Sequence, residues 1–78
     1  MNRYESAVAK LADRWTQEPA EDKADIWTRG YYSGQLSMIA LMAICDPDVE
    51  FEDYQRILAA IWETDQIIKK EGIPNEKS

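Results

Sequence analysis

The sequence predicts an all-α protein built from three helices. Apolar residues recur at intervals of three and four along most of its 78 residues, which is the spacing of one face of an α-helix. No stretch of useful length alternates apolar and polar residues in the way a half-buried strand does. Pro19, Pro47 and Pro74 stand at or beside the ends of the periodic segments, where helices begin or stop. We expect a three-helix bundle with a long central helix, with an intertwined homodimer as the alternative arrangement.

The first helix is expected over residues 3–18. From Tyr4 to Trp15 the apolar side chains keep to a single helical stripe. Asn2 is a residue type that caps helix N-termini, and Pro19 disfavours helical geometry in the residue before it.

The second helix is expected over residues 20–45, and it carries two apolar stripes on nearly opposite sides. One stripe contains Trp27, Tyr31, Gly34, Met38, Leu41 and Cys45, and the other contains Ile26, Tyr32, Leu36, Ile39, Ala40, Ala43 and Ile44. A helix that is apolar on all sides has to be covered on most of them. We therefore expect this helix to lie between the other two, or between one helix and a second copy of the chain.

The third helix is expected over residues 47–71. Asp46 is placed to cap it, and Pro47 suits its first position because the missing N–H costs no hydrogen bond there. Residues 1–74 then form one domain and residues 75–78 a solvated tail.

Three tryptophans are among the residues expected in the core. Trp15, Trp27 and Trp62 all fall on core stripes and are expected to be buried. Cys45 stands in an apolar run and is expected to act as a small buried hydrophobe. Tyr32 is a candidate binding hot spot at the edge of the core, because neighbouring residues lie about 100° apart on a helix and one of the paired tyrosines 31 and 32 must border the surface.

Asp65 interrupts the apolar stripe of the third helix, where a charge is out of place. It needs a partner, and the candidates are an indole N–H or tyrosine hydroxyl, Arg14 or Arg29, and water near the helix end.

Composition excludes several classes of function. Nine Lys and Arg face 15 Asp and Glu, for a net charge of −6, which disfavours direct binding to nucleic acid. The chain has no His and one Cys, so thiolate zinc sites and His-dependent catalysis are excluded. No apolar run is long enough to cross a membrane. We expect a non-enzymatic protein without metal or cofactor in the cytoplasm, which is the host's cytoplasm if the gene belongs to a phage.

Five carboxylates crowd the expected start of the third helix: Asp46, Asp48, Glu50, Glu52 and Asp53. Acidic residues at a helix N-terminus interact favourably with the helix dipole and keep a small protein soluble. Their alternative role is to form an acidic face that docks on a basic protein surface.

Gly30 and Gly34 form a small-xxx-small pattern that Ser37 extends by one turn. Each glycine costs a helix about 0.5–1 kcal/mol relative to alanine. Either a ring such as Trp15 or Trp62 fills the space beside them, or a kink or a second helix backbone, as in a dimer seam, explains them.

The leading functional hypothesis is a small acidic binding module that inhibits a basic, nucleic-acid-handling protein. In size, charge and helix content the chain resembles phage anti-CRISPR and anti-restriction proteins, and this resemblance implies that its carboxylates stand in for DNA phosphates. The alternative is a structural or assembly protein of a phage or bacterium that acts through helix–helix oligomerisation.

A third, remote hypothesis is enzymatic. Glu18 and Glu21, followed by Glu50 and Asp53, have a spacing that resembles the ExxE…ExxD motifs of all-α nucleotide pyrophosphohydrolases. This resemblance implies four carboxylates that hold magnesium against a nucleoside triphosphate. Pro19 lies inside the first motif, where it breaks the helix that should carry both glutamates on one face.

Overall fold

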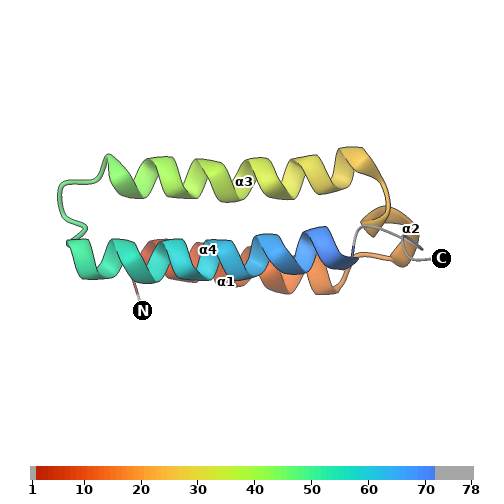
Figure 1. Ribbon diagram of the computed structural model, residues 1–78, viewed down its shortest axis with the longest axis horizontal. Helices are drawn as coiled ribbons and strands as arrows, with labels where there is room; N and C mark the ends of the chain where they lie inside the picture. Colours follow the sequence, from red (N-terminus) through yellow and green to blue (C-terminus); the bar gives the residue numbers. More distant parts are fainter. Residues whose placement is uncertain (1, 72–78) are drawn as a thin grey trace.

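The computed structural model describes residues 2–71, which form an all-α bundle. Its helices are α1 (Arg3–Thr16), α2 (Ala20–Lys23), α3 (Ile26–Ile44) and α4 (Phe51–Glu71). α1 and α4 run in the same direction, and α3 runs back antiparallel to both (Figure 1). The predicted all-α bundle is confirmed, whereas the predicted tail at residues 75–78 lies outside the described residues.

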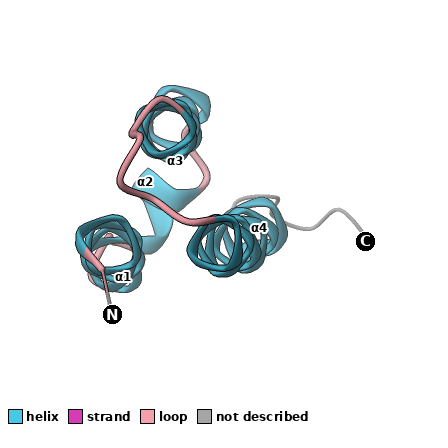
Figure 2. Ribbon diagram, turned by 90° about the vertical axis from the view of Figure 1, so that its left-hand side faces the viewer, coloured by secondary structure: helices cyan, strands magenta, loops and turns pink. Residues whose placement is uncertain are grey.

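The three long helices stand at the corners of a triangle when the molecule is seen end on (Figure 2). Each of them packs against the other two. The prediction that the second helix lies between the first and the third is therefore wrong for the single chain. α3 is covered along one side by α1 and α4, and no helix of residues 2–71 lies against its opposite side (Figure 2).

The expected helix over residues 20–45 is divided in two. Asp25 has extended backbone angles (φ −77°, ψ 127°), and its carboxylate accepts from the backbone N–H of Thr28, so it is the N-cap of α3. Aspartate favours this position because its side chain competes with the helical backbone for hydrogen bonds. Pro19 precedes a single helical turn, α2, which ends at Lys23.

The last helix begins at Phe51, four residues later than the predicted start at Pro47. Asp46 does not cap it, because its Oδ1 accepts from the N–H of Asp48 at 2.9 Å and so closes a turn two residues ahead. The carbonyl of Glu50 accepts from the Tyr54 N–H at 2.9 Å, which is where the helical hydrogen bonding starts.

α1 begins and ends close to its predicted limits. Asn2 caps it through both the Tyr4 and Glu5 N–H groups, and the Glu5 side chain accepts from the Asn2 N–H in return. The helix stops at Thr16, two residues before the predicted end.

The core has two parts that follow one another along the bundle. One part contains Val8, Leu11, Trp15, Tyr32, Leu36 and Ile68, and the other contains Tyr4, Ala43 and Ile57. Ile39 and Ile61 pack against both. The Trp15 and Tyr32 rings meet edge to face, with centroids 5.1 Å apart, a favourable arrangement for aromatic pairs.

Several residues expected in the core lie on the surface. Trp15 is buried as predicted, but Trp27 is 83% and Trp62 64% exposed. Cys45 is also exposed. For Trp27 and Cys45 the physical reason is that α1 and α4 cover only the α3 stripe that contains Tyr32, Leu36 and Ala43, which leaves the Trp27 stripe on the far side of the helix.

Candidate interaction surface

The uncovered side of α3 is a broad exposed surface, and we call it the α3 outer face. It consists of the exposed residues Ile26, Trp27, Gly30, Tyr31, Gly34, Ser37, Met38, Leu41, Met42, Ile44 and Cys45. At 100° per residue these positions occupy one broad side of the helix, opposite the core residues.

This face combines large apolar side chains with a complete lack of charge. Trp27, Met38 and Leu41 are 83%, 53% and 58% exposed. Arg29 is the single charged residue of α3, and it is not part of the face. A surface helix normally presents charged residues to water, so this composition is typical of a helix that is covered by something else.

The glycines lie in the middle of the α3 outer face. A Cβ atom placed on Gly30 or Gly34 meets nothing within 4 Å. The prediction that a ring of the same chain, such as Trp15 or Trp62, fills this space is therefore wrong. Gly30, Gly34 and Ser37 make a shallow exposed strip in which another backbone can approach closely, and whether one does stays a prediction.

A groove continues the face toward α4. Its volume is about 400 Å³, and its lining comes from α3 and α4: Ser33, Leu36, Ser37, Leu58, Ile61, Trp62 and Asp65. Ser37 belongs to both the groove and the α3 outer face, so the groove adjoins this face.

Asp65 borders this groove, and the structure gives it a partner that differs from the expected ones. Its carboxylate lies 3.0 Å from the Lys69 ammonium, one turn along α4, and 3.4 Å from the Ser33 hydroxyl on α3. A half-buried carboxylate placed between a cation and a hydroxyl is satisfied within the chain.

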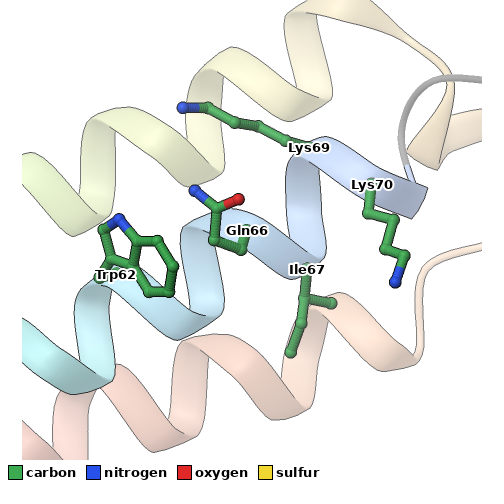
Figure 3. Close-up of a pocket in the computed structure, with 5 residues that line it drawn as sticks. All are labelled: Trp62, Gln66, Ile67, Lys69 and Lys70. Carbon is green, nitrogen blue, oxygen red and sulfur yellow. The ribbon is translucent and has the colours of Figure 1, made fainter.

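A second hollow lies on α4 itself (Figure 3). It has a volume of about 540 Å³ and is lined by Trp62, Gln66, Ile67, Lys69 and Lys70. All five side chains project from the same helix (Figure 3). Without a facing element it is a depression in the helix surface, and Trp62 connects it to the groove.

The predicted acidic face is only partly free. Asp46 accepts from the Tyr4 hydroxyl at 2.7 Å, which together with the Asp48 N–H holds the pKa of the Asp46 carboxyl below its usual value. Asp53 forms an ion pair with Arg56. Asp46, Asp48 and Asp53 line one small pocket of about 180 Å³.

The remaining two members of the acidic face, Glu50 and Glu52, are exposed and do not line that pocket. Together with Asp48, they are the exposed carboxylates of the acidic face that are available to bind a partner protein.

Tyr32 is not a surface hot spot, because it is buried in the core. Its hydroxyl donates to Glu18 Oε2 at 2.6 Å. Burial, followed by this bond to a carboxylate, raises the pKa of Tyr32 to about 12. The neighbouring Tyr31 is half-exposed and belongs to the α3 outer face.

The carboxylates of the pyrophosphohydrolase-like pattern do not form one site. Glu18 and Glu21 lie near α2, whereas Glu50 and Asp53 lie at the connection between α3 and α4, at the other end of the bundle (Figure 1). The length of α3, about 28 Å for its 19 residues, separates the two pairs. Within residues 2–71 no group of three or more His, Cys, Asp or Glu is arranged to hold a metal ion.

No helix in the described part of the chain is long and apolar enough to span a lipid bilayer. Comparison of the chain with protein-family models, with curated proteins and with solved structures gave no match.

Proposed function

We propose that this protein is a non-catalytic assembly module that binds a partner by packing the α3 outer face against an apolar helical surface. The observation that carries the proposal is the exposed, uncharged side of α3, with Trp27, Met38 and Leu41 at its centre. Transfer of apolar surface out of water stabilises a complex by about 25 cal/mol per Å².

The shape of the surface supports a helix as the docking element. Gly30 and Gly34 leave a low strip along the axis of α3, and large side chains stand on both sides of it. Ridges of one helix pack into such grooves of another. Trp27 is the expected anchor, because exposed aromatic residues dominate the energetics of many interfaces.

The acidic-inhibitor hypothesis stays a second prediction with less support. Two of its five carboxylates, Asp46 and Asp53, are engaged with Tyr4 and Arg56 in the free protein. A basic partner would then be held by Asp48, Glu50 and Glu52, which are exposed but stand apart from the α3 outer face.

The proposal is tested by photo-crosslinking in the cells that produce the protein. A photoreactive residue replaces Met38 on the α3 outer face in one variant and Ile67, an exposed apolar residue of α4, in a matched control. We expect one discrete adduct from position 38 and none from position 67. An adduct from position 67 alone, or from neither, contradicts the proposal.

Charge reversal separates the two hypotheses in the same experiment. Replacement of Asp48, Glu50 and Glu52 by lysine leaves the adduct at position 38 unchanged if the apolar face does the binding. Loss of the adduct in this variant, with the fold retained by circular dichroism, favours the acidic inhibitor.

A further inference from the structure

The α3 outer face exposes more apolar surface than a small monomer usually does. A large side chain offers about 200 Å² when fully exposed, so the exposed fractions of the large α3 residues leave on the order of 800 Å² of apolar surface. The largest apolar patch on a typical monomer measures about 300–600 Å². Each partner in a standard interface contributes about 800 Å², so the face is large enough for one half of a stable dimer.

The lack of charge on the face limits the chemistry of the partner. A charged surface placed against it loses hydration and gains no ion pair. The partner must therefore present an uncharged apolar surface of similar size. A second copy of this chain presents such a surface, because it has the same α3 outer face. Two-fold pairing through the same patch is the commonest form of oligomer.

The distribution of charge along the molecule selects the orientation of the second copy. The acidic residues between Asp46 and Asp53 lie at the end of α3 that precedes α4. A parallel pair places the two acidic segments side by side, where they repel. An antiparallel pair separates them by the length of α3, about 28 Å, which is well beyond the Debye length of about 8 Å at physiological salt. Each acidic segment then lies beside the start of the other copy's α3, where Lys23 and Arg29 partly offset Glu21, Asp22 and Asp25, so the repulsion is weaker than between two 46–53 segments.

The order of large and small residues along α3 fits an antiparallel register centred on Gly34. Gly30 and Met38 lie equally far from this centre on either side, so the side chain of Met38 on one copy stands over Gly30 on the other. Trp27 and Leu41 are related in the same way. At the centre Gly34 meets its own counterpart, where no side chain keeps the two backbones apart.

We infer that the α3 outer face binds a second copy of this chain, with the two α3 helices antiparallel about a two-fold axis at Gly34. The inference rests on the proposed function, because it names the partner of the same surface.

Sedimentation equilibrium at micromolar concentration tests the pairing. The wild-type protein is expected at twice the chain mass. Met38→Lys is expected to raise the dimer dissociation constant at least tenfold, whereas Ile67→Lys, at a residue exposed to a similar extent on α4, leaves it unchanged. A wild-type protein that sediments as a single chain, or equal effects of the two substitutions, overturns the inference.

Gly34→Leu is a second variant that tests the pairing without changing the hydrophobic core. The space beside Gly34 is empty in the single chain, so the substitution leaves the fold intact and blocks the approach of the second backbone. We expect at least a tenfold weaker dimer, and the same addition at an exposed position of α1, Ala9→Leu, serves as control. An unchanged dimer in Gly34→Leu contradicts the register.

Disulfide trapping tests the orientation. Cys45 lies about three turns from Gly34, so in the antiparallel pair the two Cys45 thiols are about 30 Å apart and cannot join. Mild oxidation of the wild-type protein is expected to give no covalent dimer, whereas Gly34→Cys in a Cys45→Ser background gives one. A Cys45 disulfide in the wild-type protein indicates a parallel pair and overturns the antiparallel register.

The mass of the photo-adduct separates failure of this inference from failure of the proposed function. An adduct at position 38 with twice the chain mass supports both. An adduct of any other mass, with a wild-type protein that sediments as a single chain, leaves the proposed function standing and overturns the pairing with a second copy.

Discussion

Tyr32 connects three parts of the bundle through a single side chain. Its ring meets the edge of Trp15 on α1, and its hydroxyl reaches Glu18 beyond the end of that helix. A buried phenol that donates to a carboxylate is stabilised in its neutral form. The contacts that bury Tyr32 therefore make the free energy of unfolding fall at alkaline pH.

We predict that the wild-type protein loses stability between pH 10 and pH 12. The pKa of Tyr32 is about 12 in the folded chain against an ordinary 10.0, so the folded state holds more protons in this range and the free energy of unfolding falls as pH rises. The full difference corresponds to about 2–3 kcal/mol at most. Urea unfolding over this range is expected to show a shallower decline for Tyr32→Phe.

Tyr31→Phe is the matched control, because it removes a half-exposed hydroxyl from the adjacent residue. It is expected to keep the slope of the wild-type protein. Equal slopes for wild type and Tyr32→Phe would show that the alkaline transition has another origin.

At the scale of single elements, α3 shows what sequence periodicity can and cannot establish. Spacing separates most members of the two stripes correctly, although Ile26 and Ile44, assigned to the stripe of Tyr32, lie on the α3 outer face. Both stripes are apolar, so their pattern contains no preference for which one is buried. Which stripe is buried depends on how Tyr32, Leu36 and Ala43 fit against α1 and α4. This fit is a property of the packed side-chain shapes and cannot be derived from the helical periodicity of the sequence. The same ambiguity explains why Trp27 was expected in the core.

A cap formed by neighbours in the sequence made the start of α1 predictable, whereas the equally local cap at Asp25 was not recognised and the start of α3 was not predicted. The Asn2 cap of α1 is confirmed because its partners, Tyr4 and Glu5, are local. Asp46 does not cap α4, because one carboxylate oxygen closes a local turn with the Asp48 N–H and the other accepts from Tyr4, which is close only in the folded chain. The lack of charge from Gly30 to Cys45 indicates that both sides of this helix need cover, but the sequence does not show that the folded chain leaves the Trp27 side exposed.

The N-cap of α3 provides a prediction for this element. Asp25→Ala removes the acceptor for the Thr28 N–H and hydroxyl, and the loss of such a cap costs about 1 kcal/mol. Chemical denaturation at one fixed protein concentration is expected to show this destabilisation. Asp22→Ala, in the single turn of α2, is the control, and an equal effect there would argue against a specific capping role.

At the scale of the whole molecule, net charge and the apolar face act in opposite directions. Each chain has a net charge of −6, so two copies repel at long range even when the surfaces that touch are uncharged. Salt screens this repulsion and leaves the burial of apolar surface in place.

We therefore predict that added salt strengthens self-association. Between about 0.01 M and 1 M salt the Debye length falls from about 30 Å to about 3 Å, and the dimer dissociation constant is expected to fall several-fold. Analytical ultracentrifugation across this range measures the effect. An association that weakens with salt would instead indicate that the acidic residues hold the partner.

The packing of α4 against α1 also affects the order of events during synthesis. The Trp15 indole donates to Glu71 across 56 positions of sequence, and Ile68 completes the core around Trp15. At a translation rate of about 5–20 residues per second, the chain from the end of α3 at Ile44 to the end of α4 at Glu71 takes about 1–5 s to appear. During that interval the sides of α1 and α3 that α4 covers in the folded chain remain exposed. The hydrophobic core of the newly made chain is therefore complete only when α4 has been synthesised.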